Sequence, residues 1–358
     1  MPQRAMRRRF LSCLIVCLSL LCVPSLLFAD GPTRSVTDDA GRQVTIPARI
    51  TKVFVAGPPA AVLLYTLAPE DMINWVEAPG TAAKAYLAAP YRDLPAYGRL
   101  TGHGKTVDPA TLKALHPDLI LDIGDVDAGY AALADRIQQQ TGIPYLLLNG
   151  HLDKTVATYR RLGDILGKTD RAASLARYAE QVLRDLPAAI AAQSPGRRPR
   201  LYYGRGKDGL QSAGHGAINL EIYDLLGADN VAAGTLGRKL QAVERAQLLA
   251  WNPDIVVAQG AAFRETLLRN PAWHHLGAVA SGHIYVQPVL PFGWVDDPPS
   301  VNRLLGAQWL APRLYPGLAW GDPRDIVRGF YKLFYQVDLG DGQLDALLAD
   351  MPPKGTMP

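Results

Sequence analysis

The sequence predicts an α/β protein made of two similar α/β lobes, each with a parallel sheet, joined by a long bridging α-helix. Three observations support this prediction. One helix-to-strand unit occurs twice, short apolar strands alternate with helical patterns in both halves of the chain, and a long stretch without turn residues separates the halves. Strands that alternate with helices indicate a parallel sheet covered on both faces.

The repeated unit is a short helix followed by a Pro-Asp step and a buried strand. It occupies residues 106–124, where His-Pro-Asp precedes Leu-Ile-Leu, and returns over residues 242–260, where Asn-Pro-Asp precedes Ile-Val-Val. A second pair of landmarks keeps the same order, with Gly-Ile-Pro-Tyr at 142–145 and Gly-His-Ile-Tyr at 282–285. Two similar lobes enclose a cleft, and small ligands usually bind in clefts between domains.

Residues 1–29 have the composition of a secretory signal peptide. Arginines at positions 4, 7, 8 and 9 precede an apolar run over residues 10–28. The run is about the minimum length for a membrane span, so a retained anchor is the alternative, although Pro24 near its end favours cleavage. No Cys stands in the context that a lipoprotein requires. We therefore expect a soluble protein exported to the periplasm.

Removal of this segment changes the composition in two ways. All three cysteines lie within it, so the mature chain can form no disulfide and no thiolate metal site. Without the four leader arginines the chain has 33 basic and 33 acidic residues, because no acid precedes Asp30. A neutral protein lacks the basic surface that nucleic-acid binding requires.

The first lobe is expected over residues 30–151. It begins with an alternating hairpin whose turn is Asp-Ala-Gly, and Pro59 stands where a helix following the first strand would start. The predicted elements are a hairpin over 35–47, strands over 52–56, 72–77, 118–123 and 144–148, and a helix over 60–67.

The bridge is predicted over residues 152–195, where apolar residues recur at helical spacing and turn residues are nearly absent. It forms either one long helix or two helices joined near Gly167. The second lobe is predicted over 196–295, with strands over 201–203, 255–258 and 284–287. A C-terminal helical segment follows over 296–358, with breaks expected at Pro312, Pro316 and Pro323.

Together these features resemble the periplasmic substrate-binding proteins of the ferric-siderophore and vitamin B12 type, which serve ABC importers. Four features carry the resemblance. They are residues 36–44, the repeated Pro-Asp motifs that end at Asp118 and Asp254 and precede a strand, the bridging helix, and residues 225–231. It implies two lobes joined by a rigid helix, small opening motions, and a ligand held between the lobes. It also implies binding and delivery to a membrane permease without chemical turnover.

One position departs from the family pattern. Members usually carry a Glu eight residues before each repeated Asp, where it docks onto permease arginines, and this chain has Ala110 and Ala246 there. Acids occur two residues earlier, at Asp108 and Glu244, which are the candidate docking residues. Both also stand where helix N-caps are expected.

The ligand-binding residues are predicted from topology, because ligands of open α/β sheets lie beyond the carboxyl ends of the strands. Arg205 and Lys207 directly follow a strand and could neutralise an anionic chelate or oxyanion, with plain surface charge as the alternative. Tyr203, at the end of that strand, and Gln259, after another strand, complete this part of the predicted site.

Three further side chains are candidates for the same site. His103 and His215 each lie in a Gly-His-Gly tripeptide, so their imidazoles could bind a metal or donate to a carboxylate, although no metal site is defined. Trp294 lies on a turn-rich segment after a strand, where it either stacks on a planar ligand or packs against the C-terminal helices.

Two classes of function remain. The first is a monomeric receptor of an ABC importer that binds an iron-siderophore or a similar metal chelate and needs no cofactor; oxyanion, corrinoid, haem and nickel or cobalt are alternative ligands. The second is a periplasmic metal-dependent hydrolase, which lacks support because the chain has no Gly-x-Ser-x-Gly, no His-Glu-x-x-His and no mature thiol.

Overall fold

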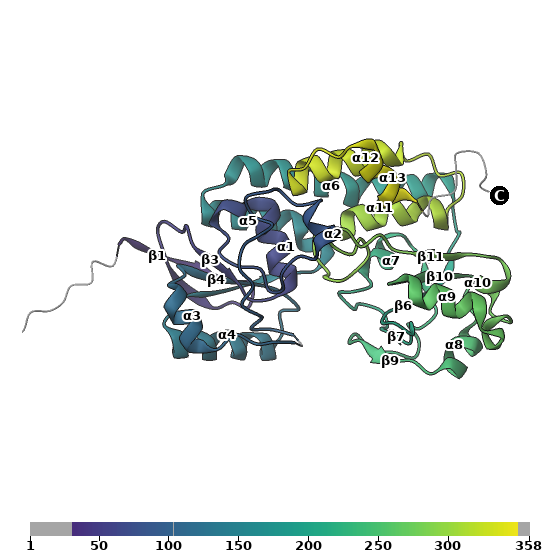
Figure 1. The fold of residues 1–358 in the computed structure, drawn as a ribbon, viewed down its shortest axis with the longest axis horizontal. Helices are drawn as coiled ribbons and strands as arrows, with labels where there is room; N and C mark the ends of the chain where they lie inside the picture. The colour runs from purple at the N-terminus through teal and green to yellow at the C-terminus, as the bar shows by residue number, and fades with distance from the viewer. Residues whose placement is uncertain (1–30, 103, 350–358) are drawn as a thin grey trace, which may run out of the picture.

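The structure, a computed structural model, describes residues 31–102 and 104–349. Two α/β lobes lie side by side, and a layer of helices runs across both of them (Figure 1). The predicted fold class is confirmed. The predicted signal peptide lies outside the described residues, and within them no helix is long and apolar enough to cross a membrane.

The first lobe contains a short hairpin and a three-stranded parallel sheet. The hairpin pairs β1 (Thr33–Thr37) with β2 (Gln43–Pro47), as predicted. The sheet has the order β3-β4-β5, formed by β3 (Val53–Val55), β4 (Leu119–Gly124) and β5 (Tyr145–Asn149). The strand in the middle belongs to the first copy of the repeated unit and is buried along its whole length.

The strand predicted over residues 72–77 does not form. Backbone pairing with β3 is limited to an isolated bridge between Met72 and Val53. The reason is Asn74, whose side chain accepts a hydrogen bond from the Val55 N–H at 2.9 Å and donates to the Val55 carbonyl at 3.3 Å. A buried side chain therefore replaces the backbone ladder at this edge of the sheet.

The two copies of the repeated unit have the same local structure. Helix α3 (Pro109–Leu115) leads into β4, and helix α8 (Arg245–Trp251) leads into β10 (Ile255–Ala258). Each helix ends at a residue in the left-handed conformation, His116 with φ 46° and Asn252 with φ 44°. The repeat in the sequence is thus a repeat in the fold.

The second lobe has a four-stranded parallel sheet in the order β11-β10-β6-β8. Its other strands are β6 (Arg200–Gly204), β8 (Asp229–Asn230) and β11 (Ile284–Val286), and a small antiparallel pair joins β7 (Gln211–Ser212) to β9 (Gln241–Ala242). The remaining helices of the two lobes are α1 (Pro58–Leu67), α2 (Thr81–Lys84), α4 (Ala128–Thr141), α7 (Glu221–Leu225), α9 (Ala261–Arg269) and α10 (Gly277–Ala280).

The predicted bridge is two helices rather than one. Helix α5 (Thr155–Leu166) ends at Gly167, which has φ 68°, and α6 (Thr169–Gln193) then passes from the first lobe towards the second (Figure 1). The 25 residues of α6 span about 37 Å at 1.5 Å per residue. The bridging element is therefore α6, and α5 packs against it.

Up to residue 349, the C-terminal segment forms three helices, α11 (Arg303–Leu314), α12 (Pro323–Phe330) and α13 (Asp341–Leu348), and a π-helical turn over Tyr331–Tyr335. Pro323 begins α12, as its position suggests. The break expected at Pro312 is wrong, because this residue lies inside the last turn of α11. These helices lie along α6 (Figure 1).

Within residues 31–102 and 104–349, three apolar cores hold the fold together. The largest runs from the first sheet through α6 and the C-terminal helices into the second sheet, and it includes Val53, Leu175, Leu201 and Phe334. Each lobe has a separate core on the other face of its sheet. The lobes are therefore coupled along the helical layer, while the apolar packing of their outer parts is independent.

Candidate functional site

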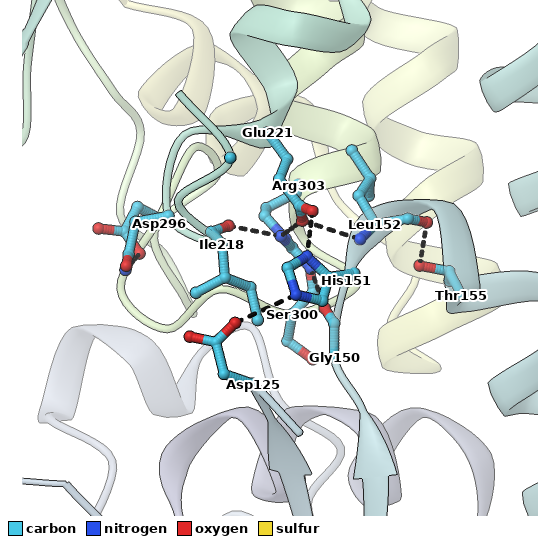
Figure 2. Close-up of polar contacts among 12 residues, drawn as sticks. Asp125, Gly150, His151, Leu152, Thr155, Ile218, Glu221, Asp296, Ser300 and Arg303 are labelled. Carbon is cyan, nitrogen blue, oxygen red and sulfur yellow. Dashed lines mark hydrogen bonds and ion pairs between the residues drawn. The ribbon is translucent and has the colours of Figure 1, made fainter. Parts of the chain in front are cut away.

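The carboxyl ends of β4 and β5 lie against the second lobe. Asp125 directly follows β4, and His151 follows β5 by two residues. Figure 2 shows both side chains pointing towards residues of the second lobe and of the C-terminal segment. The sequence analysis expected ligands at the carboxyl ends of the strands. The structure adds that this edge carries the polar contacts between the two lobes.

His151 is held between two carboxylates. Its Nδ1 lies 2.5 Å from Glu221 Oε1, which belongs to α7 of the second lobe, and its Nε2 lies 3.1 Å from Asp125 Oδ1. The Leu152 N–H donates to the other oxygen of Glu221 at 2.8 Å. Both ring nitrogens can donate only when the imidazole carries its second proton. The ring therefore links the carboxyl ends of β4 and β5 in one lobe to a helix of the other.

Arg303 completes this connection from the C-terminal segment. The side chain is 1% exposed, and its Nη1 donates to Glu221 Oε2 at 2.6 Å and to the Ile218 carbonyl at 2.7 Å. Its Nη2 donates to the Gly150 carbonyl at 2.6 Å, as Figure 2 shows. One guanidinium thus contacts the first lobe, the second lobe and, through Nε, the Ser300 carbonyl.

Arg205 lies at the end of β6, where the sequence analysis placed an anion-binding residue. Its Nε lies 3.0 Å from Asp296 Oδ2, and the two groups form an ion pair whose geometry is not that of a hydrogen bond. Its Nη2 donates a hydrogen bond to Asp297 Oδ1 at 3.3 Å. Within the described residues Nη1 has no partner. Burial raises the pKa of the Asp296 carboxyl, and the Arg205 guanidinium, followed by the Asn219 amide, opposes this shift.

Gln259 belongs to the same cluster. Its Oε1 accepts a hydrogen bond from the Gly206 N–H at 2.7 Å, and its Nε2 donates to Asp297 Oδ2 at 2.9 Å. The predicted residues Arg205 and Gln259 are therefore joined through Asp297. Lys207 lies on the exposed loop next to them.

The two predicted histidines are not brought together in the described structure. His215 has a side chain that is 76% exposed, with Nδ1 3.0 Å from Asp224 Oδ1. His103 lies outside the described residues. Within the residues that the structure describes, no three His, Cys, Asp or Glu side chains are grouped to hold a metal ion.

Two predicted ligand-binding residues lie in the core instead. Tyr203 and Trp294 are both fully buried, so neither presents a side-chain surface to a ligand. The Trp294 indole N–H lies 3.3 Å from the Tyr331 hydroxyl, and the Gln287 amide donates to the Tyr203 hydroxyl at 3.4 Å. Trp294 therefore packs against the C-terminal segment and does not stack on a ligand, because that segment covers the loop that carries this residue.

The predicted docking residues begin the two helices of the repeated unit. Asp108 accepts a hydrogen bond from the Thr111 N–H at 2.9 Å and another from its hydroxyl at 2.6 Å, and these bonds lower the pKa of Asp108. Glu244 occupies the equivalent N-cap of α8, where its own N–H donates to the Gln247 side chain at 2.9 Å. Both positions are exposed on their lobes.

Sequence reasoning missed the residues that join the lobes. The rule that ligands lie beyond the carboxyl ends of strands covers the ends of β4 and β5, where Asp125 and His151 lie, but neither Glu221 nor Arg303 was assigned a role. Arg303 lies at the start of a mostly apolar helix, and no local pattern reveals that it reaches a glycine carbonyl of the first lobe. The only available signal was the charge itself within an apolar segment.

The fold and this site define a class of proteins: two α/β lobes joined by a helix, with polar residues gathered where the strand ends of one lobe meet the other. The family model described as periplasmic binding protein matches residues 70–289. The chain therefore belongs to the periplasmic binding protein family, and the resemblance seen in the sequence is confirmed. It is a periplasmic solute-binding protein of an ABC transporter, and its relatives take part in transport.

Solved structures agree with this assignment. An ABC transporter solute-binding protein of Sulfurospirillum deleyianum is 27% identical, with a TM-score of 0.78, over 88% of this chain and 99% of its own. A molybdate periplasmic binding protein of Haemophilus influenzae is 21% identical, with a TM-score of 0.70, over 86% and 99%. A Helicobacter pylori protein in a Ni-His complex is 17% identical, with a TM-score of 0.68, over 88% and 99%.

The last two similarities extend to the fold alone. Their ligands differ from each other, so the shared fold does not select one ligand. A search among curated proteins found no match.

Proposed function

We propose that this protein captures an anionic metal chelate, in first place an iron-siderophore, in the cleft between its lobes and delivers it to the permease of an ABC importer. The observation that carries the proposal is the pair of cations after β6. Arg205 keeps Nη1 free of protein partners within the described structure, and Lys207 is exposed two residues further on. An anionic group can pair with both.

The surroundings of Arg205 support a binding role. Asp296, Asp297 and Gln259 hold the guanidinium or its loop in place before a ligand arrives. A group that is already ordered loses little conformational entropy on binding. The two acids also offset the charge of Arg205, so Lys207 is needed to make this part of the site attractive to an anion.

The same cations would suit a tetrahedral oxyanion. This alternative is favoured by one relative, the Haemophilus influenzae protein, which is named for binding molybdate. The two ligand classes differ in size and shape more than in charge. Direct comparison of a ferric chelate with molybdate on the same protein distinguishes them.

We further propose that the protein is exported by its first 29 residues, acts as a monomer, and carries out no chemical turnover. Permease docking is assigned to Asp108 and Glu244, which have equivalent places at the N-caps of α3 and α8. The symmetry of these two positions supports a partner that contacts both lobes. Replacing both acids by Ala should abolish uptake in cells and leave ligand affinity unchanged.

Equilibrium binding tests the proposal. Protein purified from the periplasm is titrated with ferric citrate, molybdate, vitamin B12 and haem by calorimetry. We expect one anionic ligand to bind, and Arg205→Ala to weaken it about 10-fold or more, because a charge-assisted bond in a desolvated site is lost. Arg184→Ala, which changes an exposed arginine on α6, is the matched control. Equal affinity of Arg205→Ala and wild type would remove Arg205 from the site.

A further inference from the structure

An ion pair connects the two lobes beside His151. Asp125 Oδ1, at the end of β4 in the first lobe, lies 4.0 Å from Arg238 Nη2 in the second lobe. Arg238 belongs to the segment between β8 and β9. Neither residue is among the ligand-binding residues named from the sequence.

Arg238 is anchored at one end and accessible at the other. Its Nε donates to the Gly216 carbonyl at 3.0 Å, which fixes the side chain against the second lobe. The side chain is nevertheless 66% exposed, and its contact with Asp125 is longer than a hydrogen bond. An exposed pair at this distance is weak and easily exchanged for another partner.

Asp125 does not depend on Arg238. The same carboxylate oxygen lies 3.1 Å from His151 Nε2, and His151 is itself held by Glu221. If the Arg238 guanidinium moves to another anion, Asp125 still lies beside the His151 ring. The arrangement therefore allows Arg238 to change partners without leaving an unpaired carboxylate.

A chain of contacts connects Arg238 to the predicted anion site on the same lobe. Arg205 pairs with Asp296, which accepts a hydrogen bond from Asn219 at 2.7 Å. Asn219 lies three residues after Gly216, whose carbonyl anchors Arg238. Arg205 is thus connected through Asp296 to one end of a short loop, residues 216–219, and Arg238 contacts the other end directly.

We propose that Arg238 is a second anion-binding residue of the ligand site, and that Asp125 occupies it until an anionic group of the ligand takes its place. This inference rests on the proposed function and deepens it. The ligand class is a chelate with more than one anionic group, one recognised at Arg205 and another at Arg238, as in carboxylate-type metal chelates.

The exchange predicts opposite effects from the two members of one ion pair. Arg238→Ala removes a ligand contact and weakens binding. Asp125→Asn removes both a competitor for Arg238 and a negative charge near the ligand, so it tightens binding. A pair that only held the lobes together would give the same sign for both variants, because either substitution breaks it.

The experiment is a double-mutant cycle with ferric citrate as the probe, followed by calorimetry on the full exported protein. We expect Arg238→Ala to lose about 5-fold or more in affinity, and Asp125→Asn to gain about 3-fold. In the Arg238→Ala background the gain from Asp125→Asn should be smaller, because only the removal of a negative charge near the ligand still contributes. An uncharged ferric trihydroxamate is the comparison ligand, and Arg245→Ala, an exposed arginine on α8, is the control variant.

Thermal unfolding of each variant shows that it is folded, and Arg238→Gln replaces Arg238→Ala if the latter is not. Loss of affinity in both single variants, or no change in Arg238→Ala, overturns the inference. If Arg205→Ala weakens the binding of ferric citrate and Arg238→Ala does not, this inference is wrong and the proposed function stands. Failure of the wild-type protein to bind any anionic probe overturns both.

Discussion

Asp122 is a buried carboxyl group in the middle strand of the first sheet. It is 1% exposed, and it accepts hydrogen bonds from the Tyr145 hydroxyl at 2.8 Å, the Ile123 N–H at 2.9 Å and the Thr101 hydroxyl at 3.3 Å. Burial raises the pKa of Asp122 to about 6, and these hydrogen bonds oppose the shift without cancelling it. The charged form is therefore costly inside this lobe.

The raised pKa predicts how stability depends on pH. Between about pH 4 and pH 6 the folded protein binds the Asp122 proton more tightly than the unfolded chain, so this residue stabilises the fold at low pH and destabilises it as pH rises. We expect Asp122→Asn to gain stability relative to wild type from pH 4 to pH 7, by up to about 3 kcal/mol. Urea denaturation at four pH values measures this difference.

Asp108→Asn is the control for this measurement. Hydrogen bonds from Thr111 lower the pKa of Asp108, so its charge stabilises the fold at neutral pH and that contribution is lost as pH falls. The two variants should therefore show opposite trends with pH. A difference between Asp122→Asn and wild type that does not change with pH would contradict the prediction.

Gly163 allows two helices of the first lobe and the bridge to pack closely. It lies in α5 where this helix meets α6, and a Cβ atom at this position would lie 2.3 Å from the Cβ of Ala172. Two small residues therefore allow the helices to approach closely. This contact is part of the joint between the first lobe and the bridging helix.

We expect Gly163→Ala to cost about 1–3 kcal/mol, because an extra methyl group forces the packed helices apart. Gly329→Ala, in the exposed part of α12, is the matched control: nothing lies within 4 Å of its added Cβ, and better helix propensity should stabilise it by up to about 1 kcal/mol. Urea denaturation compares the two. A neutral or stabilising Gly163→Ala would mean that α5 can shift freely on α6.

The sequence predicted most elements but not all of them. Hydrophobic periodicity located the core strands of both sheets and the helical middle of the chain, because these patterns are local. It failed over residues 72–77, where an apolar run looks like a strand but Asn74 hydrogen-bonds to Val55 with its side chain. It also failed at Pro312, because a proline in the last turn of a helix does not prevent that turn from forming.

At the scale of the whole molecule, the helical layer and one polar cluster hold the lobes in relation to each other. Arg303 contacts Gly150 of the first lobe and Glu221 of the second, and Glu221 holds His151. A fully buried guanidinium between two lobes restricts their relative motion. It is consistent with the small opening motions that the family resemblance implies.

We expect Arg303→Met to destabilise the protein by about 3–5 kcal/mol, because it leaves the Glu221 carboxylate without its buried partner. Hydrogen exchange should also rise at residues 150–152 and 218–222 and stay unchanged in β4. Arg184→Met, on the exposed face of α6, should change stability by less than about 0.5 kcal/mol. Normal stability of Arg303→Met would show that the apolar core alone joins the lobes.

The amino-acid sequence was enough to predict the two lobes, the repeated helix-to-strand unit, the helical bridge and the family, because local periodicity and the order of motifs record each of them. Which charges meet could be learned from the folded structure alone. Arg205 was predicted at a strand end, but its partners Asp296 and Asp297 come from a distant segment, and Trp294 is buried because the C-terminal helices fold over it. Such contacts depend on how separate elements pack, which no local pattern contains.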